Sequence, residues 1–164
     1  MLKNNKAHVY LGIDPGTHRV GYGAIKEENG QLILVECGVI EQKKDKNDMS
    51  YLPLIYKKVA TLIKKIQPDE VVIEKLFFAK NQKTAMSVAE ARGVILLAAI
   101  ENLIPIREFT PNIVKQSVSG YGAADKKSVL KMVSLILRLK DFRPIDDASD
   151  ALAIAITAAI TKTP

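Results

Sequence analysis

Apolar residues in the first forty positions gather into three runs of strand length. The runs occupy residues 8–14, 19–28 and 31–40, and each is dense enough in apolar residues to indicate a strand. The dipeptide Asn29-Gly30 separates the second run from the third. It favours a tight hairpin, because a type I′ turn needs positive φ at both central residues. The chain is therefore predicted to begin with an antiparallel three-stranded meander.

After the meander, the apolar spacing becomes that of helices interrupted by two short strands. Residues 51–66 repeat apolar positions three and four apart, which predicts an amphipathic helix. The short runs 69–74 and 105–110 predict strands on either side of a long helix, 83–102, in which Gly93 is expected at a close packing contact. Three more helices are expected toward the end of the chain, over residues 111–118, 125–139 and 146–160.

This order of elements predicts the fold class. Two strands joined by a helix pair in parallel through a right-handed crossover, whereas the meander is antiparallel. We therefore predict an α/β fold with a five-stranded mixed sheet and helices on both of its faces. A chain of 164 residues has the size of one domain, so residues 1–164 are expected to form a single domain.

Composition narrows the function classes only slightly. The formal net charge of +6 fits a polyanionic partner such as nucleic acid, and it fits a soluble basic protein equally well. Cys37 is the only cysteine, which excludes an intramolecular disulfide and a zinc-finger spacing and is expected of a cytoplasmic protein. The first ten residues lack the apolar stretch of a signal peptide, and the apolar segment 151–160 is too short to span a bilayer, so no membrane association is expected.

Acidic residues occupy places where an unpaired carboxylate would be costly to bury. Asp14 ends the first predicted strand, and Glu74 ends the fourth. If these strands are parallel neighbours, both carboxylates emerge at the carboxyl edge of the sheet, where ligand sites of open α/β sheets form. Asp147 and Asp150 are three residues apart at the start of the last helix, so they share one face of it. Small apolar residues follow them, which favours close packing of this helix on the sheet.

Four converging carboxylates would repel one another and raise one another's pKa values. Hard divalent cations relieve this conflict, and Mg²⁺ prefers oxygen ligands. Two such ions roughly 3.5–4 Å apart stabilise both the attacking and the leaving oxygen in phosphodiester hydrolysis. The pattern is therefore typical of a two-metal phosphodiester hydrolase.

Structural roles for these acids are open alternatives. Asp14 could cap the Pro-Gly turn that follows it, and Asp147 could cap its helix, where the helix dipole favours an acid. Asp146 competes with Asp147 both as a cap and as a ligand. Capping is a poor explanation for Glu74 at the end of a buried strand. All four acids together are hard to attribute to chance.

The chain resembles the RuvC family of Holliday-junction resolvases, within the ribonuclease H-like superfamily. Four blocks carry the resemblance in order and span nearly the whole chain: GIDPGT, VVIEKLFFAKNQKTAMSVAEARG, TPNIVKQSVSGYGAADKKSV and DDASDALAIAI. The resemblance implies a ribonuclease H-like fold and paired, symmetric nicking of four-way DNA junctions by a homodimer. It also implies two Mg²⁺ ions per site, for which Mn²⁺ can substitute, and a complex with a branch-migration helicase. It places the catalytic, metal-binding tetrad at Asp14, Glu74, Asp147 and Asp150.

Lys75 is a departure from the family's pattern. It adds a positive charge beside Glu74, where a neutral or acidic residue is expected. This charge bears on the metal affinity of the site and leaves the assignment of the tetrad unchanged.

Basic and aromatic residues near the acids are expected to contact DNA. Two adjacent phenylalanines follow Glu74 in the segment KLFFAKNQK. Either both are buried, or one of them stacks on bases while nearby lysines bind phosphates. The resemblance favours Phe77 as the stacking residue and makes Lys115 and Lys126 functional, whereas without it both lysines fit a solvated surface. The expected DNA contacts are Phe77, Phe78, Lys80, Lys83, Lys115 and Lys126, with Arg92 and Lys127 as weaker candidates.

Two other function classes compete with the nuclease. The segment GIDPGTHRVGYG also resembles the first phosphate loop of actin-like and sugar-kinase ATPases. Those proteins need two lobes around a nucleotide, and this chain is too short for two; ATP-dependent thermal stabilisation would identify such an ATPase. A non-catalytic DNA-binding relative is the other alternative. The tetrad argues against it, because four carboxylates would weaken binding to a polyanion.

Overall fold

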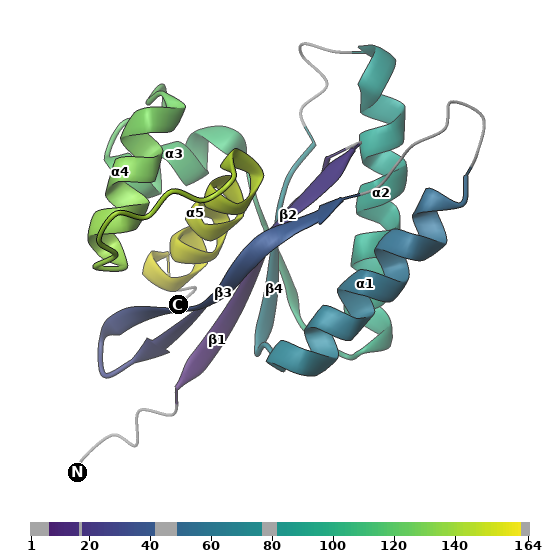
Figure 1. The fold of residues 1–164 in the computed structure, drawn as a ribbon, viewed down its shortest axis with the longest axis horizontal. Coiled ribbons are helices and arrows are strands. Elements are labelled where there is room, and N and C mark those ends of the chain that lie inside the picture. Colours follow the sequence, from purple (N-terminus) through teal and green to yellow (C-terminus); the bar gives the residue numbers. More distant parts are fainter. Residues whose placement is uncertain (1–6, 17, 42–48, 77–81, 162–164) are drawn as a thin grey trace.

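The sheet has the mixed, five-stranded architecture that the apolar pattern predicts. The computed structural model describes residues 7–16, 18–41, 49–76 and 82–161. Its strands lie in the order β3-β2-β1-β4-β5 (Figure 1). They comprise β1 (His8–Asp14), β2 (Arg19–Glu28), β3 (Gln31–Glu41), β4 (Glu70–Glu74) and β5 (Ile106–Phe109).

Strand register brings two of the predicted site residues together. Strands β1, β2 and β3 form the antiparallel meander, and β4 pairs in parallel with β1 and with β5. Ile13 is the register partner of Ile73. Asp14 and Glu74, the next residues along each strand, therefore end neighbouring parallel strands at the same edge of the sheet, as predicted.

Helices cover both faces of the sheet (Figure 1). On one face, α1 and α2 pack in a cluster that includes Leu11 and Ile13. On the other face, α3, α4 and α5 pack in a cluster that includes Tyr10 and Val72. This division follows from the strand period, because successive side chains point to opposite faces. The helices are α1 (Tyr51–Ile66), α2 (Gln82–Glu101), α3 (Pro111–Ser119), α4 (Lys126–Ile136) and α5 (Asp146–Ile160).

Two local expectations prove wrong. Helix α4 ends at Ile136 and not at residue 139, because Arg138 adopts the left-handed conformation, with φ of 55°, which ends a right-handed helix. Gly93 makes no close packing contact: a β-carbon placed there would meet no atom within 4 Å among the described residues. A glycine in the middle of a helix is therefore a poor indicator of close packing by itself.

Glycines on β1 and β2 allow α5 to lie directly against the sheet. A β-carbon at Gly12 would lie 2.1 Å from the main-chain oxygen of Ala151, and one at Gly21 would lie 2.0 Å from that of Asp147. No real side chain fits such spaces. Gly21 is the register partner of Asp14. The start of α5 is therefore held next to the end of β1, which is where the acidic pair of this helix is needed.

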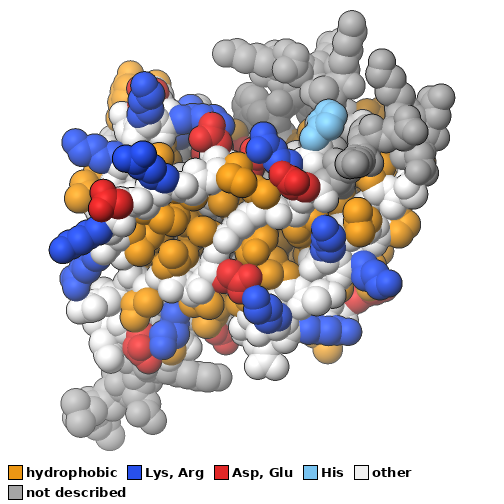
Figure 2. All heavy atoms as spheres, in the orientation of Figure 1, with side chains coloured by type: hydrophobic (Ala, Val, Ile, Leu, Met, Phe, Trp, Pro, Cys, Tyr) orange, Lys and Arg blue, Asp and Glu red, His pale blue; other side chains and the backbone are white. Residues whose placement is uncertain are grey.

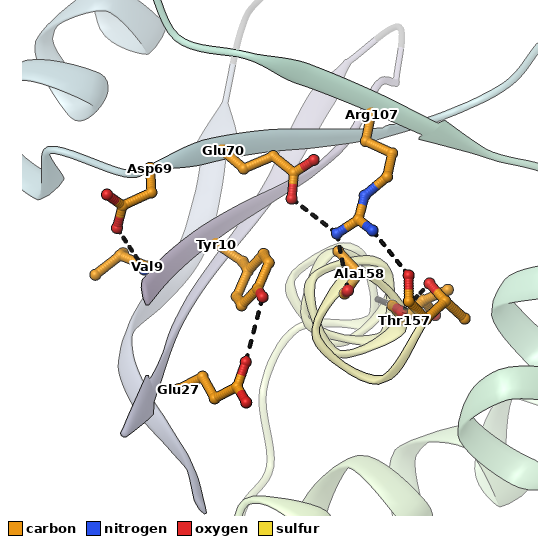
Figure 3. A network of polar contacts seen from close by, with 9 residues as sticks. Val9, Tyr10, Glu27, Asp69, Glu70, Arg107, Thr157 and Ala158 are labelled. Carbon is orange, nitrogen blue, oxygen red and sulfur yellow. Dashed lines mark hydrogen bonds and ion pairs between the residues drawn. The ribbon is translucent and has the colours of Figure 1, made fainter. Parts of the chain in front are cut away.

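The far end of α5 is fixed by Arg107 on β5 (Figure 3). Its guanidinium donates to the Glu70 carboxylate at 2.7 Å, to the main-chain oxygen of Ala158 at 2.8 Å and to that of Thr161 at 2.9 Å. It also lies 5.3 Å from the centre of the Phe109 ring. Arg107 thereby joins β4, β5 and the carbonyl groups at the end of α5, which a helix cannot satisfy internally.

Arg107→Ala is expected to lower the free energy of unfolding by about 2–3 kcal/mol. The change leaves a carboxylate and two carbonyl groups without their donor, and removing one partner of a fully buried ion pair costs about 3–5 kcal/mol. We reduce that figure because about a fifth of each side chain is exposed. Urea unfolding followed by circular dichroism measures the loss. The control is Lys26→Ala, which removes a partly exposed pair with Glu28 and should cost less than about 1 kcal/mol; equal losses would contradict the prediction.

Candidate active site

A cavity of about 210 Å³ opens where β1 and β4 end. Its walls combine acidic, basic and apolar side chains. The lining residues are Asp14, Glu74, Pro111, Val114, Lys115, Lys126, Val129, Asp150, Ala153 and Ile154. Three of the four predicted acids and two of the predicted lysines thus share one cavity.

The carboxyl groups at the strand ends are hard to ionise. Burial, together with the charges of Glu74, Asp150 and Asp147, raises the pKa of Asp14 to about 7. Burial and the charge of Asp150 raise the pKa of Glu74 to about 7 as well, against the opposite effect of two lysines. A nearby cation would restore the ionised forms. Oxygen donors of this kind, close together and reluctant to ionise alone, fit a hard divalent cation.

The two acids of α5 are each paired with a cation. The Nζ atom of Lys126, the first residue of α4, donates to Oδ2 of Asp150 at 3.0 Å. The Nε atom of Arg19, the first residue of β2, lies 3.2 Å from Oδ2 of Asp147. That oxygen is buried and accepts no well-aligned hydrogen bond from the described residues. Asp147 lies outside the cavity lining, although its charge contributes to the raised pKa of Asp14.

Three of the four carboxylates line the cavity, but the described acids do not converge on one point. Within the described ranges, no three carboxylate, imidazole or thiolate side chains are arranged to ligate one ion. The α5 carboxylates would have to leave Arg19 and Lys126 to do so. The donor set thus has the chemistry of a divalent metal site, while two of its members are engaged with side-chain cations.

Helix starts place the two cavity lysines. Helix α3 begins after Thr110, whose hydroxyl accepts from the Ile113 amide, and Lys115 lies one turn along it. Helix α4 begins after Asp125, whose carboxylate accepts from the Ser128 amide at 2.8 Å. Lys126 therefore stands at a helix N-terminus, where the helix dipole disfavours a cation and favours an anion. An anionic ligand in the cavity would be stabilised by the charges of the two lysines and by the dipole at the start of α4.

Several predicted residues lie elsewhere. Phe77, Phe78 and Lys80 fall outside the described residues. Lys83 belongs to the first turn of α2, but its side chain is likewise outside the described part. Asp146 is exposed and lines a neighbouring hollow with Lys126, Lys127 and Asp150, among others.

Two arginines contact the acids without lining the cavity. Arg92, on α2, donates from Nε to the main-chain oxygen of Glu74 at 3.4 Å and pairs with Glu108 on β5. It therefore fixes the end of β4 and is not placed to touch a ligand in the cavity. Arg19 was missed by sequence reasoning. Its signal was its position at the start of the strand that pairs with β1, two residues before Gly21.

None of the helices formed by the described residues is long and apolar enough to cross a membrane.

Comparisons with known proteins give one consistent result. The family model described as crossover junction endodeoxyribonuclease RuvC matches residues 10–158. Crossover junction endodeoxyribonuclease RuvC of Clostridioides difficile (strain 630) is 47% identical over 148 residues, which are 90% of this chain and 88% of the relative. The protein of the same name from Roseiflexus sp. (strain RS-1) is 45% identical over 146 residues, 89% of this chain and 87% of the relative.

Solved structures agree with the sequence matches. Thermus thermophilus RuvC is 32% identical, with a TM-score of 0.83 and 93% of each chain covered. The same protein in complex with Holliday junction substrate gives a TM-score of 0.86 at the same identity and coverage. These likenesses confirm the ribonuclease H-like α/β fold. With a family model that matches most of its length and relatives above 40% identity, the chain belongs to the RuvC family of crossover junction endodeoxyribonucleases.

Proposed function

We propose that the protein is a structure-selective endonuclease that resolves Holliday junctions by paired, symmetric nicks in DNA recombination and repair. The observation that carries the proposal is the cavity where Asp14, Glu74 and Asp150 meet Lys115 and Lys126. Family membership and the likeness to a junction-bound structure support the substrate. The same family membership removes the basis for the ATPase alternative.

The acids are proposed to hold two divalent ions, Mg²⁺ or Mn²⁺. Asp14, Glu74, Asp147 and Asp150 would be the ligands. Such ions lower the pKa of bound water and stabilise the attacking and leaving oxygens of a phosphodiester. The lysines have a different role from the acids. Lys115 and Lys126 bind phosphate oxygens and orient the DNA strand across the cavity. The apolar cavity walls lower the local dielectric, which strengthens each of these electrostatic contacts.

Paired nicking is best explained by a homodimer. A four-way junction has two-fold symmetry, and a symmetric dimer carries two identical sites related by its own axis. Exposed apolar side chains on α2 support this helix as the contact surface, since Leu97 is 46% exposed and Ile100 is 60% exposed.

We also propose a cytoplasmic location and association with a branch-migration helicase. Phe77 is proposed to stack on junction bases, with Phe78 as a second DNA contact and with Lys80 and Lys83 on nearby phosphates.

The function is tested with synthetic DNA and a cruciform plasmid. We expect Mg²⁺-dependent cleavage of a synthetic four-way junction and little cleavage of a linear duplex of the same sequence. On a supercoiled cruciform plasmid, two opposed nicks linearise the circle, whereas one nick only relaxes it. Linear product from a dimeric protein supports paired nicking. Accumulation of nicked circles by a monomer would contradict paired nicking, and equal cleavage of linear duplex would contradict junction selectivity.

Lys115→Ala and Lys126→Ala are expected to weaken junction binding and its dependence on salt. Each phosphate contact that is lost should reduce the slope of log K against log salt by about one. Lys and Arg side chains gather along α4 at the left of Figure 2, and Lys126 begins that helix. Binding with Ca²⁺ in place of Mg²⁺, with the DNA checked for cleavage, measures the slope over a series of salt concentrations. The control is Lys58→Ala, an exposed lysine on α1, which covers the opposite face of the sheet. An unchanged slope in both variants would return the two lysines to a solvated surface role.

A further inference from the structure

The two α5 acids differ from the two strand acids in what faces them. Asp147 is paired with Arg19 and Asp150 with Lys126. Among the described residues, neither Asp14 nor Glu74 forms an ion pair. Side-chain cations thus neutralise one half of the proposed tetrad, and the other half faces the cavity without such a partner.

Arg19 and Lys126 are not equivalent. Lys126 lines the cavity and is already placed in the proposed phosphate contacts. Arg19 does not line it, and its ion pair in the described part of the chain is with Asp147 alone. Its cross-strand partner on β3 is also an acid, Glu41, yet the guanidinium lies against Asp147. The backbone of Asp147 lies directly against Gly21, two residues after Arg19, where a β-carbon would leave no room for it.

The Arg19–Asp147 pair has the properties of a contact that a divalent ion can displace. The Arg19 side chain is 49% exposed, whereas that of Asp147 is 27% exposed. An ion pair with one half-exposed partner is weak. The contact also lacks hydrogen-bond alignment at the buried Asp147 oxygen. A guanidinium released from this contact is already half exposed to solvent, where a DNA phosphate can meet it.

We propose that Arg19 is a positioning residue. It forms an ion pair with the Asp147 carboxylate when no divalent ion is bound, and it binds a DNA phosphate when an ion displaces it from Asp147. This inference rests on the proposed function, because it assumes that Asp147 is a metal ligand. It makes metal binding and DNA binding mutually dependent through one side chain. The dependence must be reciprocal, since each ligand changes the affinity for the other by the same factor.

Arg19→Gln separates the two binding events. Without DNA, the variant should bind Mn²⁺ about three- to tenfold more tightly than the parent, because no guanidinium competes for Asp147; isothermal titration calorimetry measures this. In EDTA, the junction affinity should stay at the parent value, because Arg19 is then engaged with Asp147. With Ca²⁺ in place of Mg²⁺ and the DNA checked for cleavage, the parent should gain junction affinity, and the variant should gain about three- to tenfold less.

Two control variants sharpen the test. Arg19→Lys retains a cation and should remain close to the parent in both measurements. Lys26→Gln removes a cation from the same strand, where it pairs with Glu28 away from the acids, and should change neither. An Arg19→Gln variant with unchanged or weaker Mn²⁺ binding would overturn the proposal. If Asp14→Asn abolishes Mn²⁺ binding while Arg19→Gln leaves it unchanged, only the proposed role of Arg19 is wrong. If the parent protein itself shows no saturable Mn²⁺ binding, the proposed metal mechanism is wrong as well.

Discussion

Asp14→Asn, Glu74→Gln, Asp147→Asn and Asp150→Asn are each expected to reduce junction cleavage at least about 100-fold while junction binding persists. Each change removes a charged ligand from the proposed metal site and keeps the size of the side chain. Loss of metal placement removes the stabilisation of the attacking and leaving oxygens, which is the largest electrostatic contribution that such a site makes. Single-turnover cleavage of a synthetic junction measures the rate, and a gel-shift assay in EDTA measures binding.

Asp146→Asn is the matched control for the acid set. Asp146 is adjacent to Asp147, but it is exposed and lines the neighbouring hollow outside the cavity. Its loss should change the cleavage rate by less than about threefold. Near-parental cleavage by any one of the four acid variants would remove that residue from the site. A severe loss in Asp146→Asn would reassign the ligands on α5.

Thermal stability distinguishes a damaged site from a damaged fold. The pKa of Asp14 is raised to about 7 in the folded protein, against about 3.9 for an unperturbed aspartate. The folded state therefore binds a proton that the unfolded state has released between these two values, so this carboxyl makes the protein less stable as pH rises from about 4 to about 7. At pH 8 without metal, Asp14→Asn should melt at the same temperature as the parent or higher. A lower melting temperature would show that lost folding explains the lost cleavage.

Sequence patterns were sufficient to predict where Asp14 and Glu74 lie, because their position depends only on where two strands end and on whether those strands are parallel. Apolar runs define where β1 and β4 end, and the helix between β3 and β4 allows a parallel pairing. Asp14 and Glu74 then meet at one edge by the geometry of parallel strands. Predicting the position of the α5 acids needed one more condition. The helix must pack closely enough on the sheet for its first turn to reach that edge. The small residues after Asp150 indicated this packing, and the register of Gly12 and Gly21 provides it.

Other features depend on side-chain directions that no sequence period encodes. The pairing of Arg19 with Asp147 joins positions 128 residues apart and depends on which of two acids the guanidinium faces. Arg92 reaches a main-chain oxygen at the end of β4, so its role leaves no signature in the spacing of charged residues. Helix α4 ends before the predicted residue because Arg138 adopts the left-handed conformation. Glycine is the residue that usually marks such a helix end in a sequence, and it is absent at this position.

The placement of α5 by glycine can be tested directly, since one added methyl group should disturb both folding and cleavage. In Gly21→Ala the new β-carbon would lie 2.0 Å from the main-chain oxygen of Asp147. A contact of that kind requires the helix to move by about 1 Å, and a displacement of this size can cost about 100-fold in rate. Overpacking of a well-filled core typically costs about 1–3 kcal/mol. We expect a loss of about 3 kcal/mol here, because backbone atoms on both sides must shift.

Two further alanine variants identify the cause of the Gly21→Ala effect. Gly12→Ala introduces a similar clash with Ala151, one turn along α5, and should destabilise the protein as much while displacing the acids less. Gly93→Ala adds its methyl group in open space on α2 and should raise the free energy of unfolding by about 0.5–1 kcal/mol. Urea unfolding and single-turnover cleavage at a temperature where all variants are folded measure both effects. If Gly21→Ala loses stability but cleaves at the parent rate, the position of α5 does not set the geometry of Asp147, and the close approach of helix and sheet serves the fold alone.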